Sequence, residues 1–260
     1  MHLLQTKPGG FVDDDGIADL AQSPADMVIL STADTEISLL ATSFSRFPDD
    51  FPSLRLANLL HLRQHAAVDL YLETVVRHAR VIIVSLLGGK NYWSYGVEQL
   101  SVLSRQHNIP LALLSGDDTP DAELAKLSNV EADVYHRLWR YLREGGVGNA
   151  KAFFNYVGAT FFARDTENAV AAPTALPKVG LYHPEYDTVD LAVWQQHWHA
   201  DAPVACVLFY RAHLQAGNLR VFDALIHSLQ CQKINPLPIA LTSLKDPLCL
   251  EVVEALCERA

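Results

Sequence analysis

Apolar and polar residues alternate along the chain in blocks that predict strands and helices in turn. Short apolar runs with the length of buried parallel strands lie at 25–34, 81–87 and 110–116. Apolar residues recur three and four positions apart, the spacing of an amphipathic helix, in 35–47, 67–79 and 96–108. The stretch 54–62 fits either a strand or the start of a helix, and its pattern alone does not decide.

The alternation from about residue 25 to residue 130 is typical of one class of fold. It predicts an open parallel sheet with helices on both faces, of the Rossmann/flavodoxin-like kind. Thr119 is expected to cap the next helix, with Pro120 at its first position. Further helical spacing covers 130–146, where Gly145-Gly146 is expected to end the helix, and 149–162.

A second unit is expected after residue 178. Residues 163–178 are polar, contain Ala and Pro and lack periodicity, so they are interpreted as a linker between an N-terminal α/β head domain, 1–162, and this unit. The alternation then restarts, with strands expected at 178–184, 202–210 and 236–244 and helices at 187–198, 218–230 and 247–260. Three strands make a thin sheet with poorly covered edges. We therefore expect 179–260 to be the start of an incomplete α/β domain that continues beyond residue 260.

Composition and charge exclude several classes of partner. The 260 residues are 50% hydrophobic, which is ample for one large core or two smaller ones. The net charge is −10 and no long basic run occurs, which argues against nucleic acid and against an anionic membrane as partners. The apolar runs are far shorter than the roughly 20 residues of a membrane span. The four cysteines lack a Cys-x-x-Cys pair, so we expect reduced thiols in a cytoplasmic protein.

The stretch GGKNYWSYG, 88–96, directly follows the clearest predicted strand. It matches neither the dinucleotide-binding Gly-x-Gly-x-x-Gly motif nor the Gly-Lys-Ser/Thr end of a P-loop, so phosphate binding is not favoured. Ligands of open α/β sheets bind at the carboxyl ends of the strands, where aromatic rings can stack on a planar molecule. The alternative, which the residues alone favour, is that the rings pack against neighbouring structure. The candidate ligand-binding residues here are Gly88, Gly89, Tyr92, Trp93 and Tyr95.

A similar order follows the strand expected at 202–210. Arg211 and His213 come next, then Gly217 and a helix with Asn218 as its expected N-cap. Arg211 is suited to binding a carboxylate through two parallel hydrogen bonds, and His213 to titrating or holding a metal. The alternative is a helix cap with an ordinary salt bridge, and the residues alone favour it.

No permanent metal site and no catalytic residue is assigned. The pairs His197 and His199, and His183 and Glu185, each offer two ligands without a third at a diagnostic spacing. A Gly-x-Ser-x-Gly motif is absent. A nucleotide-dependent enzyme would need an acidic metal-binding pair near a strand end, whereas the acidic run 13–15 lies in a polar leader.

Three long stretches together resemble one family. They are 23–41, 51–100 and 204–241, and they contain GGKNYWSYG and YRAHLQAGN in that order. In these the chain is similar to the N-terminal part of the CobN family, the large subunits of ATP-dependent aerobic cobaltochelatases, which are related to the large H subunit of magnesium chelatase. The resemblance covers nearly the whole chain apart from 45–52 and 163–178.

The resemblance implies a function that the residues alone do not show. Subunits of this family bind the tetrapyrrole, hydrogenobyrinic acid a,c-diamide, and insert Co2+, which is a substrate. The resemblance implies AAA+ ATPase and companion subunits as partners that hydrolyse ATP, in agreement with the missing P-loop. It also implies catalytic residues beyond residue 260, so that this segment alone would bind substrate or act as a scaffold without turnover. A non-catalytic α/β module that binds a small molecule or another subunit is the alternative.

The resemblance also suggests how the candidate residues would act, with one departure. A macrocycle with carboxylate and amide arms suits an aromatic face with an arginine and histidine rim, so the list of candidates includes Arg211 and His213. A basic residue often precedes the Leu-Gly-Gly string in such proteins, where this chain has Ser85-Leu86-Leu87. If that basic residue meets substrate carboxylates, this chain must do so through other residues.

Overall fold

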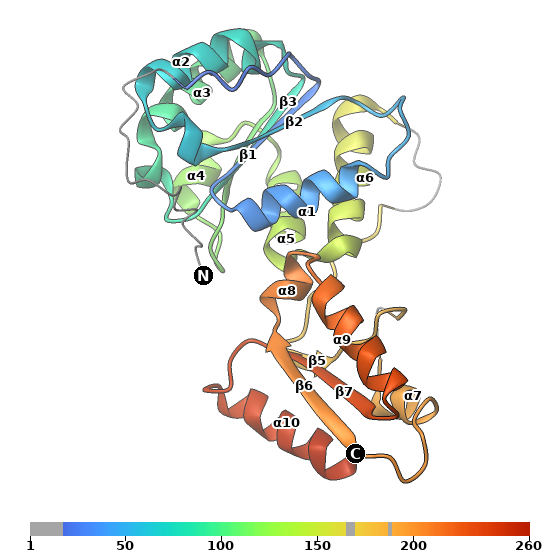
Figure 1. Cartoon of the computed structure of the whole chain (residues 1–260). Coiled ribbons are helices and arrows are strands. Elements are labelled where there is room, and N and C mark those ends of the chain that lie inside the picture. Colours follow the sequence, from blue (N-terminus) through green and yellow to red (C-terminus); the bar gives the residue numbers. More distant parts are fainter. Residues whose placement is uncertain (1–17, 165–169, 187–188) are drawn as a thin grey trace, which may run out of the picture.

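The computed structural model describes residues 18–164, 170–186 and 189–260, which form two α/β units (Figure 1). The sheet of the first unit has four parallel strands in the order β2-β1-β3-β4. Its strands are β1 (Met27–Ser31), β2 (Leu54–Asn58), β3 (Val81–Leu86) and β4 (Leu111–Ser115). This confirms the predicted open parallel sheet, with a flavodoxin-like strand order. The acidic run 13–15 and part of the expected linker, 165–169, lie outside the described residues.

Helices cover both faces of this sheet, because successive residues of a strand point to opposite sides and both sets are apolar. Val28 and Leu30 of β1 belong to the core on one face, and Met27 and Ile29 to the core on the other. The first core includes residues of α2 (His65–Thr74), α3 (Ser94–His107) and α4 (Ala122–Leu127). The second includes residues of α1 (Asp34–Phe44), α5 (Ala132–Glu144) and α6 (Gly146–Phe162).

Side-chain hydrogen bonds decide several boundaries that periodicity left open or misplaced. The stretch 54–62 is a strand followed by the 3-10 helix η1 (Leu59–Leu62), because Asn58 Oδ1 accepts from the N–H of Leu60 at 2.8 Å. The expected Thr119 cap is wrong: Asp121 caps α4 through its Oδ1. The helix expected at 67–79 is α2 followed by the 3-10 helix η2 (Val76–His78).

Two adjacent glycines separate α5 from α6. Gly145 and Gly146 have φ of 66° and 83°, a region that favours glycine, so the predicted helix stop is confirmed. A Cβ at Gly145 would lie 2.8 Å from the carbonyl oxygen of Gln215 in the second unit. The helix stop is therefore also a point of close contact between the two units.

The second unit contains a smaller mixed sheet in the order β5-β7-β6. Its elements are β5 (Val179–Leu181), α7 (Leu191–Gln195), β6 (Val204–Tyr210), α8 (Ala212–Gln215), α9 (Arg220–Cys231), β7 (Asn235–Leu241) and α10 (Pro247–Arg259). β6 runs parallel to β7, whereas β5 is antiparallel, a direction that the alternation of elements does not reveal.

Two helices of the second unit differ from expectation. α7 is shorter than 187–198, of which 187–188 lie outside the described part. α9 begins at Arg220 with Leu219 as N-cap, so the expected Asn218 cap is wrong. None of the helices in the described ranges is long and apolar enough to cross a membrane.

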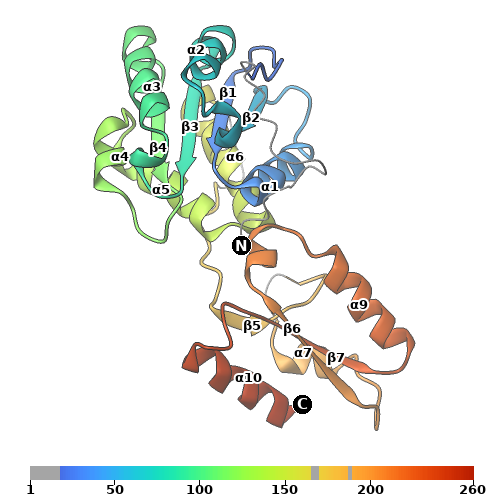
Figure 2. The ribbon, with the colours of Figure 1, turned by 60° about the vertical axis from the view of Figure 1, so that its left-hand side comes forward.

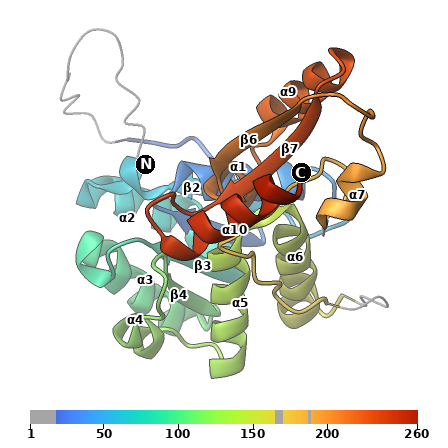
Figure 3. The ribbon, with the colours of Figure 1, turned by 90° about the horizontal axis from the view of Figure 1, so that it is seen from below.

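The second unit lies next to the carboxyl ends of the first sheet. In Figure 2 the arrow of β3 points toward the second unit. Seen from below, in Figure 3, β6, β7 and α10 lie in front of the first sheet. The short helix α8, directly after β6, packs near α6. Residues that follow β3 and β4 are thereby brought close to residues that follow β6.

Two glycines provide a matched test of this packing. A Cβ at Gly96 would lie 2.1 Å from the ring of Trp93, whereas nothing lies within 4 Å of a Cβ at Gly148 on α6. We expect Gly96→Ala to lower the free energy of unfolding by about 1–3 kcal/mol or more through overpacking. Gly148→Ala should raise it by about 0.5–1 kcal/mol, because alanine loses less backbone entropy in a helix. Urea unfolding of both variants checks this, and equal effects would contradict the packing described.

Candidate functional site

The turn after β3 depends on its two glycines. Gly88 and Gly89 have φ of 85° and 71°, which other residues rarely adopt. The N–H of Gly88 donates to Asp117 Oδ2 at 3.1 Å, so a carboxylate already occupies it. Lys90 pairs with Glu123 at 3.4 Å and with Glu98 at 3.8 Å. The N–H of Gly88 and the ammonium group of Lys90 are thus both engaged with acidic side chains.

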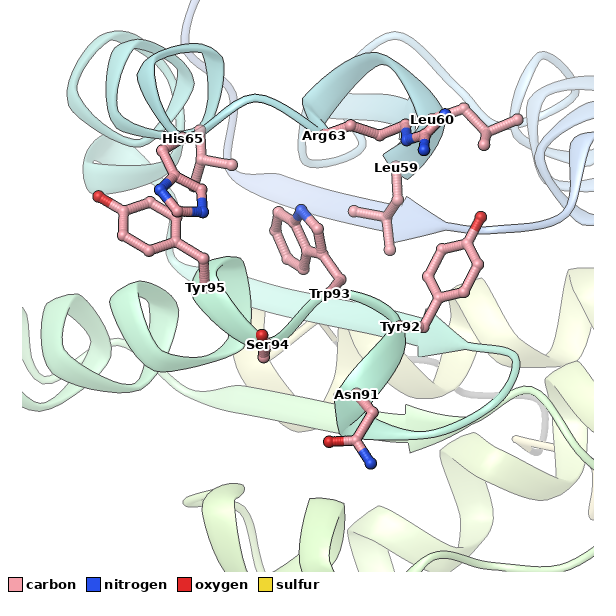
Figure 4. Close-up of a pocket in the computed structure, with 10 residues that line it drawn as sticks. Leu59, Leu60, Arg63, His65, Asn91, Tyr92, Trp93, Ser94 and Tyr95 are labelled. Carbon is pink, nitrogen blue, oxygen red and sulfur yellow. The ribbon is translucent and has the colours of Figure 1, made fainter.

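The three aromatic residues of the turn line one cavity of about 340 Å³, here named the aromatic cavity. Figure 4 shows Tyr92, Trp93 and Tyr95 opposite residues of η1 and α2. The lining residues are Leu59, Leu60, Arg63, His65, Val68, Asn91, Tyr92, Trp93, Ser94 and Tyr95. The cavity is bounded at the carboxyl ends of β2 and β3 by the 3-10 helices η1 and η3 (Lys90–Tyr92).

The three rings differ in how much of each is free. Trp93 is 6% exposed and its Nε1 donates to the carbonyl of Leu62 at 2.7 Å, so most of its ring is packed in the core and little of it is open to a ligand. The Tyr95 ring stacks on His65 at 3.9 Å between centroids, and its hydroxyl donates to Asp69 at 2.7 Å. Tyr92 is 48% exposed and offers the most open ring of the three.

Arg211 and His213, which sequence reasoning placed together, face different surroundings. Arg211 turns toward the segment that joins the two units, where its Nη1 donates to the carbonyl of Leu176 at 2.7 Å. The His213 ring instead packs edge-on against Phe222 of α9, at 4.9 Å between centroids. Arg211 lines a cavity together with Leu87, the residue before Gly88, whereas His213 lines neither of the two cavities.

That second cavity, of about 470 Å³, lies between the two units and is here named the junction cavity. Its lining residues are Glu36, Ser85, Leu87, Ser115, Gly116, Asp118, Leu142, Arg143, Arg211 and Gln215. The strand order reverses between β1 and β3, and in open α/β sheets such a switch point forms a crevice outside the strand ends. Glu36 follows β1 and Ser85 belongs to β3, so the cavity lies at this switch point.

Sequence reasoning missed Glu36 and Arg143 as site residues. A signal existed for Glu36, because it follows a predicted strand in the first turn of a helix, at the edge where ligands bind. Arg143 lies in the last turn of α5 and carries no such signal. Only the packing of α5 beside β4 brings it to the cavity.

Glu36 has an unusual environment. Ser85 Oγ donates to Glu36 Oε2 at 3.0 Å, while Oε1 is buried without a hydrogen-bond partner in the described part of the chain. Burial raises the pKa of Glu36 to about 7, and hydrogen bonds from Ser85 and Ser31 offset this only in part. Near neutral pH the carboxyl group is therefore divided between its protonated and ionised forms.

The two arginines of the junction cavity are only partly neutralised. Arg143 Nη2 pairs with Asp118 Oδ1 at 2.7 Å. Burial, together with the nearby charge of Arg143, lowers the pKa of Arg211. The Nε atoms of both arginines are buried and lack a partner among the residues that the structure describes. Two unpaired donors, one on each arginine, and one unpaired acceptor, Glu36 Oε1, thus belong to residues that line this cavity, and the guanidinium groups suit an anionic or carbonyl-bearing group.

The histidines singled out in the sequence do not converge on a ligand set. His183 lies 4.5 Å from the ring of Trp194, and its Nδ1 accepts from the N–H of Glu185 at 3.1 Å. His197 and His199 follow α7 in the loop before β6. Within 18–164, 170–186 and 189–260, no group of three or more His, Cys, Asp or Glu side chains is arranged to hold a metal ion. The cysteines in these ranges are free thiols.

Comparisons with known proteins point to one family. Residues 139–260 match the family model described as CobN/Magnesium Chelatase. All of this chain aligns with the aerobic cobaltochelatase subunit CobN of Pseudomonas aeruginosa at 50% identity, and with that of a Sinorhizobium species at 36%. The chain spans 21% of the length of each of these relatives. The catalytic subunit of cobaltochelatase from Mycobacterium tuberculosis has a similar structure, with a TM-score of 0.65 and 26% identity, covering 87% of this chain and 17% of that one.

The buried carboxyl group of Glu36 predicts a pH-dependent stability. Its pKa in the folded chain is about 7, above the ordinary value of 4.5. Its contribution to the free energy of unfolding is therefore fully present below pH 4.5 and is lost as the pH rises through 7. The loss is at most about 3 kcal/mol. Glutamine does not titrate, so from pH 4.5 to above pH 7 the free energy of unfolding of Glu36→Gln should rise by up to about 3 kcal/mol relative to that of wild type.

Urea unfolding at several pH values measures that difference. Glu254→Gln, which changes an exposed residue of α10, is the matched control and should show no such trend. A difference between Glu36→Gln and wild type that is the same at every pH would show that Glu36 titrates at an ordinary pKa.

Proposed function

The chain belongs to the CobN/magnesium chelatase family, and from that premise we propose that it is the N-terminal segment of the tetrapyrrole-binding large subunit of an ATP-dependent cobaltochelatase. The observation that carries the proposal is the 50% identity to a cobaltochelatase subunit along all of this chain. The whole protein would insert Co2+ into hydrogenobyrinic acid a,c-diamide in cobalamin biosynthesis. AAA+ ATPase and companion subunits would hydrolyse the ATP.

Within that protein, this segment would contribute substrate binding or act as a scaffold rather than carry out turnover. Its Gly88-Gly89 turn is not set up for a nucleotide phosphate, because the N–H of Gly88 is bonded to Asp117 and Lys90 is paired with Glu98 and Glu123. A tetrapyrrole instead offers a flat conjugated ring with carboxylate and amide arms. Such a ligand suits tyrosine faces and arginine forks.

The aromatic cavity is the proposed contact for an edge of the ring. Its volume of about 340 Å³ lies near the lower end of the roughly 300–1,000 Å³ of small-molecule sites, so it would take part of a macrocycle. Tyr92 offers the open ring face, and Arg63 from the other wall could meet an arm. Tyr95 is held by His65 and Asp69 and would position the rim of the cavity.

A second candidate function is subunit assembly without substrate binding. The edge strand β6 of the second sheet exposes apolar side chains along one face: Val204 (38%), Leu208 (40%) and Tyr210 (57%). Apolar side chains left in water are a common feature of protein contact surfaces. This function predicts binding to another chelatase subunit, with no affinity of the isolated chain for the tetrapyrrole.

Calorimetric titration of the chain with hydrogenobyrinic acid a,c-diamide distinguishes the two functions. We expect saturable binding that Tyr92→Leu weakens about 2- to 10-fold, the size of one ring-stacking contact. Trp93→Phe should leave the affinity unchanged, but it should lower the free energy of unfolding by about 1 kcal/mol, because the hydrogen bond to Leu62 is lost.

Tyr186→Leu is the matched control, since Tyr186 is also 48% exposed but lies in the second unit. Its affinity should equal that of wild type. Failure of the folded chain to bind the tetrapyrrole would contradict the substrate-binding role and would favour the assembly function.

A further inference from the structure

The junction cavity has the features of a separate ligand site. We propose that it binds a peripheral carboxylate arm of the tetrapyrrole between Arg143 of the first unit and Arg211 of the second. The identity of the ligand rests on the function proposed above, whereas the carboxylate site itself follows from the cavity. The site would fix the orientation of the macrocycle and would join the two units through the bound arm.

Unsatisfied polar atoms concentrate at this cavity. In the described part of the chain, five buried side-chain nitrogen or oxygen atoms lack a hydrogen-bond partner, and three of them belong to residues lining it: Glu36 Oε1, Arg143 Nε and Arg211 Nε. Buried polar atoms in folded proteins nearly always have partners, and each one left without costs about 1–3 kcal/mol. A ligand with two oxygens would supply acceptors for guanidinium donors that the described part of the chain leaves unused.

Two guanidinium groups and two carboxylates surround the cavity. Arg143 and Arg211 lie close enough for each charge to act on the other. Asp118 pairs with Arg143, and Glu144, whose Oε2 accepts from the N–H of Leu176 at 3.1 Å, lies near Arg211. Because Asp118 and Glu144 already balance these two charges, an incoming carboxylate would be held mainly by directed hydrogen bonds, for which the guanidinium forks of parallel N–H groups are suited.

The position of the cavity is where a ligand is expected in this fold. It lies at the β1/β3 switch point, and in flavodoxin-like sheets ligands bind outside the strand ends at that point. The second unit closes over it: Gln215 Nε2 donates to the carbonyl of Arg143 at 3.2 Å, and Arg211 Nη1 donates to the carbonyl of Leu176. An arm held by both arginines would therefore touch both units.

Glu36 makes binding depend on pH. When protonated it can donate a hydrogen bond to a carboxylate, and when ionised it repels one. Ser85 donates a hydrogen bond to Glu36, and Ser31 also acts to lower its pKa. The charged groups that line the cavity with it are Asp118, Arg143 and Arg211. Asp34 lies on the same helix as Glu36, and Glu144 lies near Arg211. The affinity for a carboxylate should fall as pH rises through about 7.

Two probes test the site by calorimetry on the whole 260-residue chain: hydrogenobyrinic acid a,c-diamide, and citrate, which has carboxylates but no ring. Arg143→Gln and Arg211→Gln should each lower the affinity for both probes about 10- to 100-fold, the size of a lost charged hydrogen bond. Arg220→Gln on exposed α9 is the control with the same change of charge and should bind both as wild type does. Tyr92→Leu should lower the affinity for the tetrapyrrole and leave the affinity for citrate unchanged.

Two further variants keep the test decisive. Arg211→Lys retains the charge but loses the fork of parallel N–H groups, so its affinity for both probes should lie between those of wild type and Arg211→Gln. If the glutamine variant folds poorly, the lysine variant still tests the site, because its affinity should be lower than that of wild type. Glu36→Gln should abolish the decline in affinity between about pH 6 and pH 8, which a purely structural role of Glu36 would not alter.

The outcomes separate this site from the proposed function. If the arginine variants bind the tetrapyrrole as wild type does while Tyr92→Leu weakens it, the junction site is overturned and the proposed function stands. If citrate binds in an arginine-dependent way but wild type does not bind the tetrapyrrole, the site remains, while the ligand named for it and the substrate-binding role are overturned. Binding of neither probe overturns both.

Discussion

The parallel pairing of β1 with β3 is the constraint on which both candidate cavities depend. Its register places Ser31 opposite Ser85 at the end of the two strands. Just beyond, the N–H of Thr32 donates to the carbonyl of Ser85 at 3.2 Å, and the N–H of Leu87 donates to Thr32 Oγ1 at 3.1 Å. The segments that follow the two strands then diverge, with α1 on one face of the sheet and α3 on the other, because their apolar residues pack in opposite cores. The crevice between them holds the carboxyl group of Glu36.

The two cavities offer complementary chemistry at one edge of the sheet. The aromatic cavity combines the exposed ring of Tyr92 with a polar rim, which suits a flat conjugated surface. The junction cavity combines two guanidinium groups with a carboxyl group of raised pKa, which suits an acidic arm. Leaving Glu36 partly unsatisfied costs stability above neutral pH, and such local costs are typical of sites that bind ligands.

The contact between the two units is polar and specific. Leu176 is held from both sides, its N–H by Glu144 and its carbonyl by Arg211, and the absence of a side chain at Gly145 lets the backbone at Gln215 approach. Basic side chains from both units therefore face the same space. Arg143 of α5 and Arg211, which follows β6, are the two basic residues among those that line the junction cavity.

The sequence by itself determined the local elements and the family. Periodicity located β3 and β4, the glycine pair at 145–146 marked the end of a helix, and two short strings in order identified the relatives. Periodicity also predicted helices on both faces of the sheet, because a strand buried on two sides must be apolar throughout.

Only the tertiary structure decided which residues meet. Trp93 is buried because Gly96 leaves room for its ring, and β5 pairs with β7 in the antiparallel direction. Arg211 and His213, two residues apart, are turned to different neighbours, while Glu36 and Arg143, from distant helices, line one cavity. Residue patterns encode the local geometry of a helix or a strand. The meeting of distant side chains depends on strand order and helix packing, which no local pattern specifies.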